Sequence, residues 1–316
     1  MPHAVSHARL KADAATAAKT IRSIAIWSTS LERKGALEKC FTKKPVPESF
    51  EDLLLRTYQA PHYGKDGLFG SFESAAGLAL LAKRQLGKGK PQRVKGDLAV
   101  SPHRKGATPS PYFWHGDLTV DGKLELDEGA WMIVTGNLTV GDAFVDDYHG
   151  SQLVVGGSMT VKRMSTAGGV VVLGDLRVED GIVADGNDAS LWVAGTLTAP
   201  IVVTNYHHID ATKERCRRVV THNQHESAKK RELRELFVDG VFDMEFEPET
   251  PEDDDDAHSL DVTKLRVAFA SGKSVFRAAR KAAPKKAAAP KKAPAAKKKK
   301  APAAKKAAPK GKAKKR

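Results

Sequence analysis

Six aspartates have the type and spacing that could support acid–base chemistry. They recur in looser turns between short apolar runs in the middle of the chain. They are Asp142, Asp146, Asp147, Asp180, Asp185 and Asp188. Two carboxylates on neighbouring turns can act as a general acid and a general base. Acidic residues are also common in exposed turns, so catalysis by these turn carboxylates is an alternative hypothesis and not our leading prediction.

Histidines form a second group of candidate residues. His207 and His208 lie together, and Cys216, His222 and His225 follow. Such side chains are common metal ligands, but their spacing here matches no zinc motif. We predict surface or end-cap histidines, no metal and no cofactor, and keep the His207/His208 region as the second form of the enzyme hypothesis. The Ser-Gly-Lys-Ser stretch at 271–274 matches only the end of a P-loop and is rejected as a phosphate site.

The third group is basic. Residues 280–316 contain 15 Lys, 2 Arg and no acid, so this tail carries +17. The whole chain carries +14, and the part before the tail therefore carries −3. Lysines on a flexible chain neutralise phosphates without reading base sequence. The predicted nucleic-acid-binding residues are Lys285, Lys286, Lys291, Lys292, Lys297, Lys298, Lys299, Lys300, Lys305, Lys306, Lys314 and Lys315. The tail has no aromatic residue, so it offers no base stacking.

A five-residue phrase organises the chain between these groups. It consists of Gly, a small polar residue, Leu or Met, any residue, and Val or Ala. It begins at Gly96, Gly116, Gly136, Gly157, Gly174 and Gly195. A recurrence of about 20 residues is typical of a solenoid, and only the step from Gly157 to Gly174 is clearly shorter. We predict that these glycines form corners, because glycine adopts backbone conformations that other residues avoid.

The residues around each glycine favour strands. Apolar runs such as 132–134 and 170–173 precede it, and Leu-x-Val alternates after it. We predict a mainly β protein with a short parallel β-helix of about five or six coils over 94–206. An antiparallel sandwich is the alternative. The middle residues of the phrase, Thr119, Thr139, Thr160, Arg177 and Thr198, should form an outward row. A threonine row can bind ice, but threonine is also common on exposed strands, and Arg177 interrupts the row.

The remaining segments differ in composition. We expect a helical region over 1–88, with helices near 8–27 and 71–86. Residues 207–248 should form a charged cap, with a helix over 211–237 and then a strand or hairpin. An acidic linker over 249–258, a short helix within 259–279 and a disordered basic tail over 280–316 complete the expected order.

Composition also bounds the setting. The two cysteines, Cys40 and Cys216, make no disulfide framework, which favours a reducing compartment. We find no run of about 18 apolar residues and no signal-peptide pattern at the start. We therefore expect a cytoplasmic protein, with association with the nucleoid as a further expectation, and no contact with membranes.

Two resemblances extend these predictions. The tail, with blocks such as 283–286 and 297–300, resembles the tails of linker histones and the Lys-Ala-Pro extensions of some bacterial histone-like proteins. The coil, with phrases such as 134–138 and 173–176, resembles the bactofilins and a group of uncharacterised bacterial proteins with the same repeats. Bactofilins are bacterial cytoskeletal proteins that polymerise end to end. The resemblance implies a scaffold that self-associates, and a protein-binding, inhibitor-like module is a further alternative.

Overall fold

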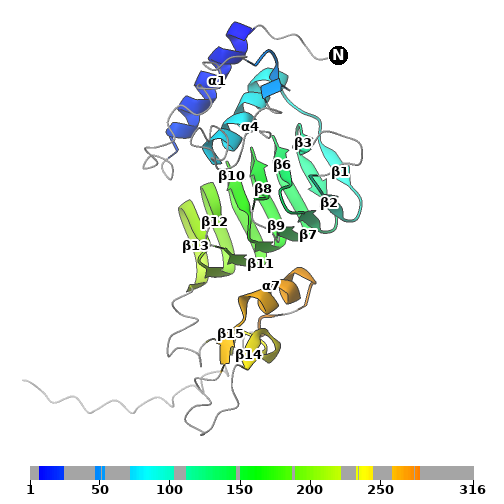
Figure 1. Cartoon of the computed structure of the whole chain (residues 1–316), viewed down its shortest axis with the longest axis vertical. Coiled ribbons are helices and arrows are strands. Elements are labelled where there is room, and N and C mark those ends of the chain that lie inside the picture. Colours follow the sequence, from blue (N-terminus) through cyan, green and yellow to red (C-terminus); the bar gives the residue numbers. More distant parts are fainter. Residues whose placement is uncertain are drawn as a thin grey trace, which may run out of the picture. The chain divides into compact units, whose positions relative to one another are not determined.

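The chain folds around one parallel sheet that is wound into a solenoid (Figure 1). A computed structural model describes residues 7–24, 47–50, 52–53, 72–102, 112–146, 150–186, 189–221, 233, 235–244, 258–273 and 275–277. Residues 1–277 form one compact unit, which is the unit described below, and 278–316 form a second one. The predicted mainly β fold with a parallel β-helix is confirmed.

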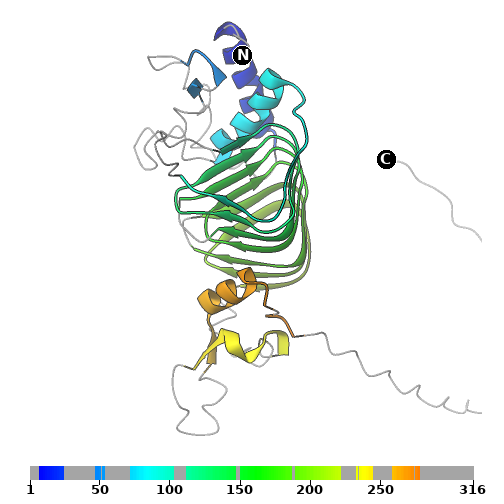
Figure 2. The ribbon, with the colours of Figure 1, turned by 90° about the vertical axis from the view of Figure 1, so that its right-hand side faces the viewer.

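The strands follow one another as short segments in the early coils and as longer, bent segments in the later ones. Their bounds are β1 Gln92–Val94, β2 Leu98–Val100, β3 Tyr112–Trp114, β4 Leu118–Val120, β5 Leu124–Leu126, β6 Trp131–Val134, β7 Leu138–Asp146, β8 Gln152–Val155, β9 Met159–Thr166, β10 Gly169–Val172, β11 Leu176–Asp185, β12 Ser190–Asn205 and β13 His208–Thr221. Figure 2 shows the coils stacked edge to edge, all turning in the same direction.

The pairing registers divide each coil among three faces. Face A contains residues 92–94, 118–120, 138–140, 159–161, 176–178, 196–199 and 213–216. Face B contains residues 98–100, 124–126, 143–146, 163–166, 181–185, 201–205 and 218–221. Face C contains residues 112–114, 131–134, 152–155, 169–172, 190–193 and 208–211. All of these pairings are parallel, so each residue type recurs at the same place in successive coils.

Alternation along each strand fills the inside of the solenoid. In the phrase around Gly136, Leu138 and Val140 point inward and are 0% and 2% exposed. Their partners one coil later, Met159 and Val161, are fully buried in the same core. Inward apolar side chains of one coil stack on inward apolar side chains of the next. Burial of this core therefore stabilises the stack as a whole, whereas one coil by itself could not bury its apolar side chains.

The glycine corners between faces C and A touch one another directly. A Cβ added at Gly136 would lie 2.3 Å from Asp117 Oδ1 and 2.5 Å from the backbone of Gly116. A Cβ added at Gly157, Gly174 or Gly195 would likewise lie 2.4, 2.5 or 2.4 Å from a side-chain oxygen of the preceding corner. Of the six predicted corners, only Gly96 and Gly116 have positive φ, at 77° and 110°. At the other four, glycine is required by the close approach of successive corners and not by backbone freedom.

The polar residue after each glycine links its coil to the next one. The backbone N–H of Asn137 donates to Asp117 Oδ1 at 2.7 Å, and that of Ser158 donates to Asn137 Oδ1 at 2.9 Å. The N–H of Thr196 donates to Asp175 Oδ1 at 2.7 Å. These side chains satisfy backbone donors that the bend removes from the sheet ladder. The small polar residues of the phrase therefore form a ladder of hydrogen bonds along the solenoid.

The first copy of the phrase lies at a different corner from the others. Leu98 pairs with Leu124 on face B, whereas Leu118 pairs with Leu138 on face A. Gly96 therefore corresponds to Gly122, whose N–H donates to the Gly96 carbonyl at 2.9 Å. The interval from Gly96 to the next phrase equals the true repeat by coincidence, because the segment 101–111 lengthens this coil.

Two helices cover the outside of face C. They are α1 (His7–Arg22) and α4 (Phe72–Leu86), which lie where the sequence predicts helices. Five outward positions of face C are apolar: Phe113, Ile133, Val154, Val171 and Trp192. They pack with Leu78, Leu81 and other apolar residues of the two helices. The middle coils of face C, at β6, β8 and β10, are therefore buried on both sides.

One lysine of α4 reaches a corner of the solenoid. Lys83 Nζ donates to the carbonyl oxygen of Gly156 at 2.5 Å. Burial lowers the pKa of Lys83, and the nearby charge of Asp117 partly opposes this shift. The helix is therefore tied to a corner as well as packed on face C.

A second set of elements packs on the outside of face B. It comprises η3 (Asp239–Val241), the antiparallel pair β14 (Phe242–Met244) and β15 (His258–Leu260), and α7 (Val262–Ala270). Val183, Ile201 and Val203 of face B share a buried cluster with Phe237 and Phe269. The helix α7 lies in the segment 259–279, where a short helix is predicted. Asp261 caps it by accepting from the N–H of Lys264 at 2.9 Å.

The predicted helix over 211–237 is wrong over its first part. Residues 208–221 form β13, a further coil, so the solenoid runs beyond residue 206. β12 offers a full row of backbone partners, and β13 pairs with it along all three faces. Its charged residues are tolerated because, among the described residues, the last coil pairs with a neighbour on one side only. Glu214 stands opposite the inward Leu197 and is exposed.

Candidate functional site

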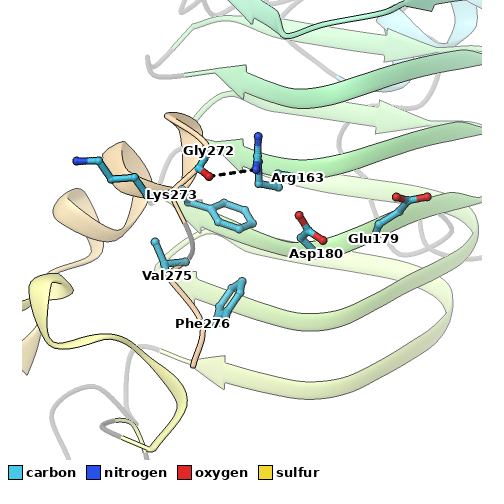
Figure 3. A pocket seen from close by; sticks show the side chains of 8 residues that line it. Arg163, Glu179, Asp180, Gly272, Lys273, Val275 and Phe276 are labelled. Carbon is cyan, nitrogen blue, oxygen red and sulfur yellow. Dashed lines mark hydrogen bonds between the residues drawn. The ribbon is translucent and has the colours of Figure 1, made fainter. Parts of the chain in front are cut away.

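The cavity drawn in Figure 3 lies where the segment after α7 meets the solenoid. Its volume is about 330 Å³. It is lined by Arg163, Glu179, Asp180, Phe269, Gly272, Lys273, Val275 and Phe276. Gly272 has φ +83° and turns the chain at the end of α7. The Ser-Gly-Lys stretch at 271–273 therefore ends a helix, whereas a P-loop begins one.

Arg163 holds this junction together. Its side chain is 10% exposed and forms an ion pair with Asp142 from the preceding coil. Its Nη1 donates to the carbonyl oxygen of Gly272 at 3.5 Å, shown as the dashed line in Figure 3. Its Nε has no hydrogen-bond partner among the described residues. A buried arginine with a carboxylate and a carbonyl around it is balanced in charge, so Arg163 fastens the α7 segment to the solenoid.

Two acidic residues, Glu179 and Asp180, line the cavity from an irregular corner of the solenoid. The register between β9 and β11 shifts between Val178 and Gly181, which leaves Glu179 and Asp180 outside the ladder. Beside them, the rings of Phe269 and Phe276 pack edge to face with their centroids 5.4 Å apart. Among the described residues, neither Glu179 nor Asp180 forms an ion pair. The cavity therefore combines two cations, two anions and apolar rings, with no single charge in excess.

The predicted turn carboxylates are not assembled into one site. Asp142 is paired with Arg163, and Asp180 lies in the cavity. Asp146 is fully buried and accepts from the Ser151 hydroxyl and, at 3.4 Å, from Thr166. Asp147 and Asp188 lie outside the described residues.

Asp185 is occupied by contacts within the fold. It accepts from Asn205 Nδ2 at 2.9 Å and is 3.5 Å from Arg266 Nη1. Arg266 also donates to the Asp146 carbonyl at 3.1 Å, so one arginine of α7 joins two turns of the solenoid. Three of the four described turn carboxylates, Asp142, Asp146 and Asp185, therefore stabilise the solenoid or its covering helix.

His207 is a buried neutral histidine at the turn between β12 and β13. It is 3% exposed, and its Nδ1 lies 3.2 Å from the carbonyl oxygen of Asp185. Burial lowers the pKa of His207 to about 4; the Asp185 carbonyl opposes this shift and Arg266 adds to it. Its Nε2 has no partner in the described part of the chain. His208 is exposed, with Nε2 at 3.9 Å from Asp210 Oδ2. This arrangement fits the end-cap prediction.

The predicted outward row on face A is confirmed. Thr119, Thr139, Thr160, Arg177 and Thr198 pair directly with one another in successive coils. The registers extend the row to Arg93 at one end and Arg215 at the other. Arg93 forms an ion pair with Asp121 at 2.8 Å. These two ends were not predicted because they lie outside the six phrases.

Several predicted residues cannot be placed. The twelve tail lysines, Cys40, His222, His225 and the acidic linker up to 257 lie outside the described residues. Cys216 is a partly buried free thiol whose pKa is raised by burial and by Glu214. Within the described ranges, no group of three His, Cys, Asp or Glu could hold a metal ion. No helix there is long and apolar enough to cross a membrane.

Arg163 and Arg266, the two cations that hold α7 on the solenoid, were not predicted. A signal for Arg163 was present, because this charged residue stands in register with the small residues Ala143 and Gly181 on face B. Comparisons with protein-family models, with curated proteins and with solved structures found no match. A function can therefore be inferred only from the chain's own residues.

Proposed function

We propose that the protein is a non-catalytic scaffold whose basic tail holds nucleic acid without reading its sequence. The observation that carries this proposal is the separation of charge. Residues 280–316 carry +17 with no acid, while the rest of the chain carries −3. Polyanion binding by lysines is driven by counterion release, which needs a local excess of positive charge and no folded pocket.

The solenoid supports the scaffold part of the proposal. Its coils are fixed by continuous parallel pairing and by a core of fully buried side chains. Such a stack is stabilised by the contacts between neighbouring coils. The enzyme alternative has less support: Asp142, Asp146, Asp185 and His207 all make contacts that hold the fold together. The proposed setting is the cytoplasm, in association with the nucleoid.

Self-association through the coil ends is a further part of the proposal. In the part of the chain that the structure describes, β13 pairs only with β12, so one of its edges is open to a strand. Head-to-tail stacking in register would place Arg215 beside Arg93 on face A. Like charges directly opposite one another are unfavourable, and salt screens them. Assembly should therefore grow with salt concentration, as light scattering can measure.

Binding of random-sequence duplex DNA tests the proposed function. Full-length protein and a 1–279 truncation are compared at about 50 and about 200 mM salt, with particle size recorded in the same samples. We expect the full-length protein to lose roughly 10³-fold or more in affinity over this range, as for six or more phosphate contacts, and the truncation to bind at least tenfold more weakly. Equal binding by both proteins, or none by either, would refute the tail as the nucleic-acid handle.

A further inference from the structure

We infer that face A is a second nucleic-acid contact surface, which binds the phosphate backbone alongside the tail. This inference rests on the proposed function and adds a folded site to it. Face A differs from the other two faces in what lies over it. Face C is covered by α1 and α4, and face B by the α7 segment. In the described ranges, no helix contributes to a buried cluster over face A.

The outward row of face A consists only of threonine and arginine residues. Its members are Arg93, Thr119, Thr139, Thr160, Arg177, Thr198 and Arg215, in the order of the strands. Neighbouring coils are about 4.8 Å apart, so the row is roughly 29 Å long. No acidic and no apolar side chain interrupts it. Arg177 and Arg215 are exposed and form no ion pair with described residues.

Charge complementarity identifies the occupant. Guanidinium and hydroxyl groups are among the side chains that most often contact phosphate oxygens, and they do so without base specificity. The row has no aromatic residue on which a base could stack and no apolar residue that a protein partner would bury. A nucleic-acid backbone lying along the row therefore fits it better than a protein does.

The cations at the end of the solenoid extend this surface. Lys213 and Arg217 lie on β13 beside Arg215, and both are exposed. Two acids flank Arg177 along the chain: Asp175, which precedes β11 and whose Oδ1 accepts from a backbone N–H, and Glu179, which lies at the corner toward the cavity. The strongest contact is therefore expected around Arg177 and Arg215, roughly 10 Å apart across two coils.

The test uses the full-length chain, so that the tail contributes equally in every variant. Arg177→Thr/Arg215→Thr continues the threonine row and keeps residues that suit exposed strands. The matched control, Lys11→Gln/Lys19→Gln, removes the same charge from exposed positions on α1. Binding of random duplex DNA is measured across a salt series. For the face A variant we expect a slope of log Kobs against log salt that is less steep by about 2, and about tenfold weaker binding at about 0.1 M salt. The control should keep the wild-type slope.

A charge insertion gives an independent second measurement. Thr139→Glu places an acid in the middle of the row, and Thr16→Glu places one on the exposed side of α1. We expect the first to weaken DNA binding severalfold and the second to leave it unchanged.

The outcomes separate the two proposals. If the wild type binds DNA and the face A variants match their controls, the inference is overturned while the tail proposal stands. If the full-length wild type does not bind DNA at all, both are overturned.

Discussion

Faces C and A are built from the same coils, yet they meet different surroundings. Their inward positions are alike, with apolar side chains in one continuous core. Their outward positions differ completely. On face C they are Phe113, Ile133, Val154, Val171 and Trp192, and they are packed under the two N-terminal helices. On face A they are threonine and arginine, with no packed helix among the described residues.

The difference shows that the outward residue of each strand decides what a solenoid face can bind. A strand that is apolar on both sides must be buried on both sides, as in a parallel sheet covered by helices. A strand with a polar outward residue stays in contact with water or with a polar ligand. The runs at 132–134 and 170–172 are continuous, whereas the phrases after each glycine alternate. The two kinds of face are therefore distinguishable from the sequence.

The largest effect should come from placing the same acid on both faces. Val171 is fully buried under the helices, so Val171→Asp buries an unpaired carboxylate and should cost about 4 kcal/mol of unfolding free energy. Thr139→Asp on the exposed face A should change that free energy by about 0.5 kcal/mol or less. Urea denaturation of the wild type and both variants measures these changes in unfolding free energy. Equal losses would contradict the distinction between a covered and an open face.

The corner glycines should show the next largest effect. Gly136→Ala places a methyl group 2.3 Å from Asp117 Oδ1, and the backbone of Gly116 blocks its retreat. We expect a loss of about 3 kcal/mol, because successive corners must move apart. Gly240→Ala is the matched control, since a Cβ there meets nothing within 4 Å. Thermal or urea unfolding compares them, and a Gly136→Ala protein as stable as Gly240→Ala would rule out close stacking of the corners.

A smaller effect concerns the buried turn between β12 and β13. Because the pKa of His207 is lowered from 6.5 to about 4, the unfolded chain binds more protons than the folded one between these values. The contribution of neutral His207 to the unfolding free energy is therefore complete above about pH 6.5 and is lost as the pH drops toward 4. At pH 5 the loss is about 2 kcal/mol. In His207→Gln, unfolding free energy should fall less between pH 7 and pH 5 than in the wild type.

The exposed neighbour provides the control for that experiment. His208→Gln is the matched variant, because it removes the neighbouring solvent-exposed histidine and leaves the buried His207 in place. If His207→Gln loses as much stability on acidification as the wild type, His207 is not the buried group that titrates.

Much of the fold was predictable because the repeat is local. The phrase fixes which residues point inward, and the outward threonine row followed from the period of two along a strand. The coil that begins at Gly96 was misplaced because its length was hidden by the segment 101–111. β13 was missed because Glu214 occupies an inward position and no glycine phrase precedes it.

The candidate site was less predictable because its contacts join distant parts of the chain. Asp142 and its partner Arg163 are 21 residues apart, and Arg266 contacts Asp146 across 120 residues. Nothing near Asp142 or Asp146 in sequence shows that an arginine will balance or anchor them. Such pairings depend on which coil is stacked next and where α7 returns.

Chemical footprinting of lysine and arginine side chains on the full-length protein, free and saturated with random duplex DNA, tests the role of the tail most directly. We predict protection of tail lysines such as Lys285 and Lys297 and of Arg177 and Arg215, with Lys11 and Lys19 on α1 equally reactive in both states. Unchanged reactivity of the tail lysines in the presence of bound DNA would contradict the central claim that the tail holds the nucleic acid.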